Sequence, residues 1–103
     1  MDSLTDFFHT LDGLYADGRH DEIEDFLRRT LAQHRICCGG HDAVFTAALN
    51  ELGTYYRGAS RYDESVQAFE EAGRDILSYG QKDTADYATN RINLAGTLRL
   101  QHQ

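Results

Sequence analysis

The 103-residue chain contains no proline, so a helix in it can end only at glycine or at polar turn residues. It also lacks any run of about 18 apolar residues, so we expect no membrane-spanning helix. The residues from Met1 to Asp6 lack the basic and apolar regions of a secretory signal. No run of β-branched residues alternates with period two, as a strand would require. These absences favour an all-α domain with a cytoplasmic location.

Basic residues are scarce, and the formal net charge is −7. Such a surface repels polyanions, so we expect no nucleic acid and no anionic membrane as a partner. Eight of the 17 carboxylates lie in the first 25 residues, which contain a single arginine, Arg19. The N-terminal end should therefore be acidic and the remainder more mixed in charge.

Signatures of catalysis are also missing. The sequence has no Gly-x-Ser-x-Gly, no His-Glu-x-x-His, no phosphate loop and no dinucleotide fingerprint. Carboxylates cluster at 22–25 and 70–71, but such runs on amphipathic helices are typical of a solvated face. We therefore predict no enzyme activity, no catalytic residues and no cofactor.

What is present is helical periodicity in five amphipathic segments. Their apolar residues recur at three- and four-residue spacing, as Phe7, Leu11 and Leu14 do in the first segment. Glycine-bearing breaks separate the segments, and these are Asp17-Gly18, Gly39-Gly40, Gly58 and Gly80. Because the connections are short, sequential helices should be antiparallel neighbours.

The segments repeat. The motif Arg-x-Asp-Glu at 19–22 recurs at 61–64, and Leu-Gly-x-x-Tyr at 52–56 recurs as Leu-Ala-x-x-Leu at 94–98, both 42 residues later. The first helix matches the third at an offset of 41, with Tyr15 aligned on Tyr56. We therefore expect the break after Tyr15 to be one residue shorter than its counterpart.

The central repeat resembles the tetratricopeptide (TPR) signature. The segment Leu49-x-x-Leu52-Gly53-x-x-Tyr56, followed by Ser65-x-x-x-Phe69-x-x-Ala72, fits its pattern of large and small positions. The small residues Gly53, Ser65 and Ala72 would let two helices approach closely. The 42-residue period, with Gly40-His41 before Leu49-Asn50-x-Leu52-Gly53, is similar to the kinesin-light-chain-like subclass.

This resemblance implies a right-handed TPR-type solenoid of stacked antiparallel helix pairs. The single domain, 1–103, would hold two and a half repeats, at about 3–38, about 42–79 and about 83–101. Three positions depart from the family pattern. Leu77 lies near the place of the helix-ending proline, Asp42 follows His41 where proline would stand, and Asp12 occupies a small-residue position.

The resemblance also implies a protein–protein interaction module, with a concave groove lined by the first helix of each pair. The expected groove positions are Asp6, His9, Gly13 and Ala16, then Ala47, Asn50, Thr54 and Arg57, then Thr89, Asn93, Gly96 and Arg99. Asn50 and Asn93 would each offer a donor and an acceptor to a peptide. Arg57 and Arg99, 42 residues apart, would hold a partner's acidic side chain or C-terminal carboxylate. The alternative is that both arginines are solvated or paired with a neighbour such as Glu51.

Two other hypotheses stay open. The fifth helix carries Ile92, Leu94, Leu98 and Leu100, more apolar than a terminal cap should be. We therefore also consider a fragment of a longer repeat protein, or a homodimer formed through this helix.

A third hypothesis is metal or redox sensing through His34, Cys37, Cys38 and His41. Thiolates and imidazoles are zinc ligands, but this spacing matches no familiar zinc pattern. A disulfide between Cys37 and Cys38 is disfavoured, because adjacent Cα atoms are about 3.8 Å apart. We therefore predict no bound metal.

Overall fold

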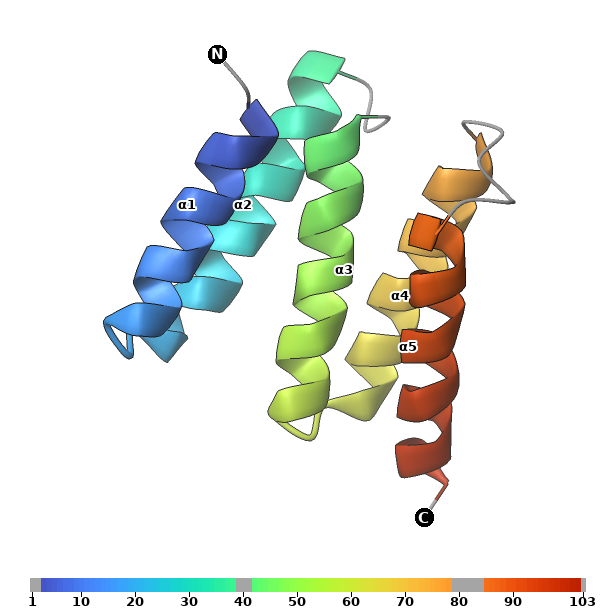
Figure 1. The fold of residues 1–103 in the computed structure, drawn as a ribbon. Coiled ribbons are helices and arrows are strands. Elements are labelled where there is room, and N and C mark those ends of the chain that lie inside the picture. Colours follow the sequence, from blue (N-terminus) through green and yellow to red (C-terminus); the bar gives the residue numbers. More distant parts are fainter. Residues whose placement is uncertain (1–2, 39–41, 79–84, 103) are drawn as a thin grey trace. The chain divides into compact units, whose positions relative to one another are not determined.

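A computed structural model describes residues 3–38, 42–78 and 85–102. These residues contain five helices: α1 (Ser3–Ala16), α2 (His20–Cys38), α3 (Ala43–Gly58), α4 (Tyr62–Ser78) and α5 (Ala85–Gln101) (Figure 1). No strand occurs in this part of the chain. The predicted all-α architecture with five helices is therefore confirmed.

The chain divides into two compact units, Met1–Ala48 and Leu49–Gln103. The boundary between them lies inside α3. The first unit holds α1, α2 and the beginning of α3. The second holds the rest of α3 together with α4 and α5. It contains the predicted groove residues Asn50, Thr54, Arg57, Thr89, Asn93 and Arg99.

In the first unit, α1 packs on α2 through an aromatic and aliphatic core. Phe7 stacks on Phe26, with ring centroids 5.6 Å apart. Leu11 on α1 and Ile23 and Leu27 on α2 are buried. The spacing of these residues explains the pairing, because positions three or four apart share one helix face.

The turn between α1 and α2 reverses the chain in three residues. The amide of Gly18 donates to the Tyr15 carbonyl (3.1 Å), and the amide of Arg19 donates to the Leu14 carbonyl (3.0 Å). Gly18 has a φ of 67°, the left-handed conformation that ends many helices. The Arg19 side chain then pairs with Glu22 in the first turn of α2.

The turn between α3 and α4 has the same hydrogen bonds 42 residues later in the sequence. The amide of Ser60 donates to the Arg57 carbonyl (3.1 Å), and the amide of Arg61 donates to the Tyr56 carbonyl (2.8 Å). Ser60 takes the left-handed conformation, with a φ of 62°. The Arg61 side chain pairs with Glu64 through two hydrogen bonds, of 2.8 and 2.7 Å.

These equal turns correct the expected register of the first helix. The prediction that the break after Tyr15 is one residue shorter is wrong, because Leu14 rather than Tyr15 corresponds to Tyr56. Burial agrees, since Tyr56 is buried whereas Tyr15 is exposed. The 42-residue spacing therefore holds for α1 as well as α2. It also places the buried Leu11, not Asp12, at the position of Gly53.

In the second unit, α3 and α4 approach closely at small residues, as predicted. A Cβ atom on Gly53 would lie 2.7–2.8 Å from three atoms of the Phe69 ring, so only glycine fits there. The Ser65 hydroxyl donates to the Gly53 carbonyl over 2.7 Å. Ala72 is fully buried one turn beyond Phe69.

Helix α5 packs against α4 through an unusually polar face. Leu94 is buried there, but so are Asn90 and Thr97. The Thr97 and Ser65 hydroxyl oxygens lie 3.4 Å apart. This face leaves the most apolar side chain of α5, Ile92, 71 % exposed.

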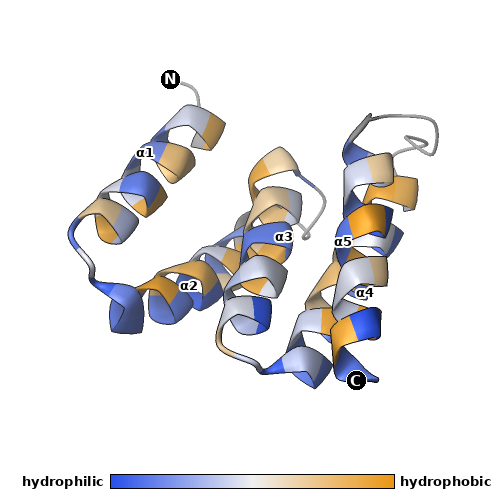
Figure 2. Ribbon diagram, turned by 60° about the horizontal axis from the view of Figure 1, so that its bottom comes forward, coloured by the Kyte–Doolittle hydropathy of each residue, from blue (hydrophilic) through white to orange (hydrophobic). Residues whose placement is uncertain are grey.

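Hydrophobic and hydrophilic residues alternate along the helices (Figure 2), but α5 is much less amphipathic than the other four. Helix α4 shows the pattern clearly, with Ala68, Phe69 and Ile76 on its buried face. Within residues 3–38, 42–78 and 85–102, no helix combines the length and apolarity needed to span a membrane.

Candidate functional site

Three of the four predicted groove residues of α3 form one stripe along the helix. Asn50, Thr54 and Arg57 are spaced by four and three residues, and each is half-buried. The Thr54 hydroxyl donates to the Asn50 carbonyl over 3.1 Å. The stripe therefore presents a carboxamide, a hydroxyl oxygen and a guanidinium in sequence.

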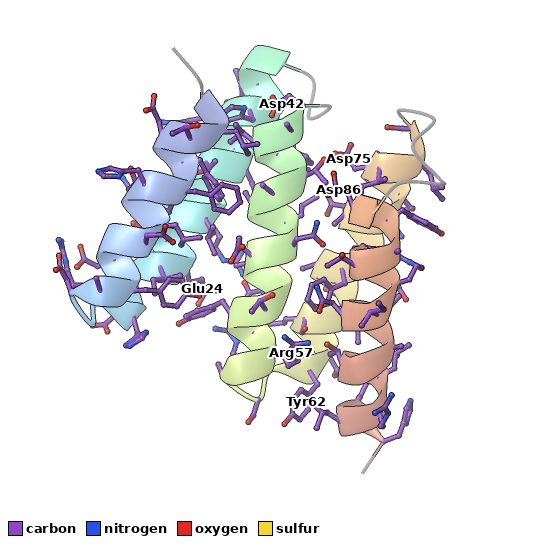
Figure 3. All side chains as sticks on the ribbon, in the orientation of Figure 1. Glu24, Asp42, Arg57, Tyr62, Asp75 and Asp86 are labelled. Atoms are coloured by element: carbon purple, nitrogen blue, oxygen red, sulfur yellow. The ribbon has the colours of Figure 1, made fainter. Side chains whose placement is uncertain are left out.

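Arg57 extends from α3 toward α5 (Figure 3). A Cβ atom on Gly96 would lie 4.0 Å from the Arg57 Nη1 atom and within 4 Å of no other neighbouring group. That distance is ordinary van der Waals contact, so the guanidinium lies beside α5 without requiring glycine at position 96. Among the described residues, no carboxylate forms an ion pair with Arg57.

Four of the other eight arginines of the described segments are paired with an acidic residue three or four positions away. These pairs are Arg19–Glu22, Arg28–Glu24, Arg29–Asp25 and Arg61–Glu64. Each joins residues three or four apart on one helix, where such contacts form readily. Arg57 differs from these four because it is half-buried beside a second helix and forms no ion pair among the described residues.

The predicted groove residues of α5 are more open. Thr89 and Arg99 are exposed, and Asn93 is half-buried. The Asn93 carbonyl accepts a 3.0 Å hydrogen bond from the buried Thr97 hydroxyl. In the part of the chain that the structure describes, Arg99 has no hydrogen bond or ion pair. Its pairing with Arg57 across one carboxylate stays a prediction.

The structure adds one residue that the sequence analysis missed. Asn90 of α5 is buried, and its Nδ2 donates to the Asn50 Oδ1 atom over 3.0 Å. The same nitrogen donates to the Phe69 carbonyl over 2.9 Å. Its position four residues before Leu94 places it on the buried face of α5. The four-residue spacing from Leu94 could have identified Asn90 as a buried residue, but the sequence analysis placed only apolar residues on this face.

In α1, the corrected register changes which residues match the α3 stripe. The expected positions Asp6, His9, Gly13 and Ala16 are all exposed. With the 42-residue spacing, the residues that correspond to Asn50, Thr54 and Arg57 are instead Phe8, Asp12 and Tyr15. Two of the three are exposed aromatic residues, so α1 presents a chemistry different from that of α3.

The cluster considered for metal binding contains a different interaction. His34 Nδ1 lies 2.8 Å from Asp42 Oδ2, at the start of α3 (Figure 3). Asp42 also caps α3, because its Oδ1 accepts the Phe45 amide over 2.8 Å. His41 and the side chains of Cys37 and Cys38 lie outside the described residues.

The pKa of Asp42 reflects this arrangement. Partial burial alone would raise it, but the hydrogen bonds with His34 and from the Phe45 amide outweigh that effect and lower the pKa below its usual value. Asp42 is therefore a carboxylate already engaged on both oxygens.

The described segments hold no group of three or more His, Cys, Asp or Glu residues placed to bind a metal ion. Comparisons of the chain with protein-family models, curated proteins and solved structures found no match. The candidate functional site is therefore the α3 stripe formed by Asn50, Thr54 and Arg57.

Proposed function

We propose that the chain is a protein-interaction module of the tetratricopeptide type, which binds an acidic segment of a partner along α3 and α5. The observation that carries this proposal is Arg57. Its guanidinium lies beside Gly96 and pairs with no carboxylate of the described residues, in a chain with 17 acidic residues. A partly desolvated cation of this kind binds an external carboxylate more strongly than a fully exposed one.

The repeat interpretation has two supports. Turns with identical hydrogen bonds and matching Arg–Glu pairs recur 42 residues apart, at 14–22 and 56–64. The contact of Gly53 with Phe69 is the small-against-large packing expected of a TPR helix pair.

The proposed ligand is a peptide that carries a carboxylate, either at its C-terminus or on a side chain. Arginine suits this role because its planar fork can donate two parallel hydrogen bonds to one carboxylate. Asn93, which is half-buried on α5, would contact the adjoining main chain. Thr89 and Arg99, both exposed, would extend the surface.

The test is a calorimetric titration with a panel of acidic peptides, each made with a free and with an amidated C-terminus. We expect Arg57→Ala to raise Kd about 10-fold or more, because a hydrogen bond to a charged group contributes about 1.5–3 kcal/mol. Arg99→Ala should have a smaller effect. Comparison of the free and amidated forms distinguishes a terminal from a side-chain carboxylate.

Arg74→Ala is the matched control, because Arg74 is an exposed arginine of α4 that forms no ion pair among the described residues. It should leave Kd unchanged. If neither Arg57→Ala nor Arg99→Ala alters the affinity of a peptide that binds, the proposed site is wrong.

Self-association through α5 is a second candidate function, and one observation favours it. Ile92 is 71 % exposed and Leu100 is 37 % exposed. Leu94, which had been expected to contribute, is instead buried within the second unit. Sedimentation at micromolar concentration tests this candidate, and a dimer that Ile92→Lys converts to a monomer would support it.

A further inference from the structure

A buried carboxamide joins three helices of the second unit. Asn90 of α5 donates from Nδ2 to Asn50 Oδ1 on α3 and to the Phe69 carbonyl on α4. Its Oδ1 accepts from Arg91, at 3.0 Å from Nε and 2.8 Å from Nη2. Every hydrogen-bonding position of Asn90 is therefore used within the protein.

These contacts leave only one orientation for each amide. The Phe69 carbonyl can only accept, so it requires the nitrogen of Asn90, and the Arg91 guanidinium can only donate, so it requires the oxygen. Asn90 therefore turns an N–H toward Asn50, and the atom of Asn50 that meets it must be the oxygen. The Asn50 Nδ2 group is left to face away from Asn90.

Two neighbouring contacts hold the Asn90 amide in this orientation. A Cβ atom on Gly73 would lie 2.7 Å from Asn90 Oδ1 and 2.1 Å from Arg91 Nη2, so glycine makes the space for both groups. The Arg91 guanidinium also lies over the Tyr87 ring, 5.2 Å from its centroid. Arg91 is thus held on the oxygen side of Asn90 from two directions.

We infer that Asn90 is a positioning residue, which fixes Asn50 so that the α3 surface presents a hydrogen-bond donor and selects an acceptor on the ligand. No buried side-chain nitrogen or oxygen in the described segments lacks a partner, and Asn50 is only half-buried. Its Nδ2 group, with no partner among these residues, therefore reaches solvent.

This inference rests on the proposed function and adds to it that the ligand must carry a hydrogen-bond acceptor opposite Asn50. Asn50 and Arg57 are seven residues apart on α3, which corresponds to roughly 10 Å along the helix. An extended peptide covers that distance in about three residues. The ligand that fits has a main-chain carbonyl at Asn50 and a carboxylate about three residues away at Arg57.

The first arm of the test uses the free protein and needs no ligand. Side-chain amide exchange measured by NMR should show both Asn90 Nδ2 hydrogens protected and the Asn50 Nδ2 hydrogens exchanging rapidly. A scalar coupling through the hydrogen bond should connect Asn90 Nδ2 to Asn50 Cγ. A protected Asn50 amide beside a rapidly exchanging Asn90 amide would overturn the inference, whether or not any peptide binds.

The second arm compares two substitutions of Asn50, using the tightest acidic peptide of the panel as the probe. Asn50→Asp keeps an oxygen for Asn90 but replaces the outward donor with an acceptor, whereas Asn50→Ala removes both. We expect both variants to raise Kd, Asn50→Ala by roughly three- to ten-fold and Asn50→Asp by at least as much. Retained affinity in Asn50→Asp, with loss in Asn50→Ala, would mean that Asn50 presents its oxygen and would contradict the inference.

Ala95→Asp controls for the added negative charge, because it places a carboxylate on an exposed residue of α5 that lies outside the proposed groove and has no Asn90 contact among the described residues. The loss in Asn50→Asp should exceed the loss in this variant. If the wild-type protein binds no acidic peptide, the proposed function fails, and the NMR arm alone decides whether Asn90 positions Asn50.

Discussion

The two complete helix pairs share a turn but not a core. Both reverse direction through the same two main-chain hydrogen bonds, a left-handed residue and an Arg–Glu pair. The left-handed residue is Gly18 in one pair and Ser60 in the other. The hydrogen bonds of the turn therefore recur 42 residues later, whereas the side chains in the core of each helix pair differ.

The cores differ in how volume is distributed between the two helices. In the second pair, Gly53 on α3 faces the large Phe69 on α4. The corresponding residues of the first pair are Leu11 and Leu27, both buried and both of middle size. Packing density constrains the sum of the facing side chains rather than each one, so both solutions fill the space.

The largest effect is expected from a methyl group added to the glycine of the second pair. Gly53→Ala would place Cβ 2.7–2.8 Å from atoms of the fully buried Phe69 ring, so the ring or a helix would have to shift. We expect the free energy of unfolding to fall by about 1–3 kcal/mol, as overpacking typically costs. Urea denaturation followed by circular dichroism measures this.

Gly13→Ala on α1 is the matched control, because no neighbouring atom lies within 4 Å of a Cβ at that position. It should stabilise the protein by up to about 1 kcal/mol through helix propensity. Adding Phe69→Leu to Gly53→Ala should make the combined loss smaller than the sum of the single losses. Additive losses would show that the two residues do not share one space.

The sequence predicted the helices well because their apolar spacing is a local property. The predicted register of α1 was wrong because the alignment matched Tyr15 with Tyr56 on residue identity. The turn hydrogen bonds match Leu14 with Tyr56 instead. Identity of side chains is a weaker guide than the main-chain geometry that follows from turn length.

The candidate site was predicted in part. Asn50, Thr54 and Arg57 lie along one stripe of α3, as helical spacing requires. Asn90 was missed because a buried polar residue carries no hydrophobic signal, and its burial depends on acceptors that only the folded chain brings near. Local sequence patterns likewise could not predict that Arg57 lies beside Gly96, because the two residues are on different helices.

The next largest effect on stability is expected when Gly18 and Ser60, the left-handed residues of the two turns, are exchanged. A non-glycine residue at positive φ costs about 1 kcal/mol relative to glycine. Ser60→Gly should therefore raise the free energy of unfolding, and Gly18→Ser should lower it, each by about 1 kcal/mol at most. Denaturation midpoints of the two variants and of the double exchange test this. A loss of stability in Ser60→Gly would mean that the serine side chain makes a contact that outweighs the backbone cost.

A pH-dependent effect distinguishes the start of α3 from the starts of α2 and α4. Helix α3 begins at the Asp42 cap, whose lowered pKa reflects its bonds with His34 and the Phe45 amide. A carboxyl with a pKa lowered by folding stabilises the protein above its unfolded pKa of 3.8, and that stability is lost as pH falls through the folded value.

The advantage of wild type over Asp42→Asn should thus shrink as the pH falls below about 4. Asparagine keeps the cap, so the difference isolates the charge. Urea denaturation of both proteins between pH 7 and pH 3 measures it. An advantage that grows toward pH 3 would contradict the assignment.

The smallest expected effect concerns the arginines that immediately precede α2 and α4. The Arg61 side chain pairs with Glu64, and its guanidinium carbon also lies 4.4 Å from the centroid of the Tyr56 ring. Arg19 pairs with Glu22 on the exposed surface and has no such ring contact among the described residues. We expect Arg61→Met to lower the free energy of unfolding by about 0.5–1 kcal/mol, mainly through loss of the cation–π contact. Arg19→Met should have a smaller effect that salt removes, because an exposed ion pair is screened. Denaturation at low and at 1 M salt checks both variants. Equal losses at the two arginines would show that the aromatic contact does not distinguish the second turn from the first.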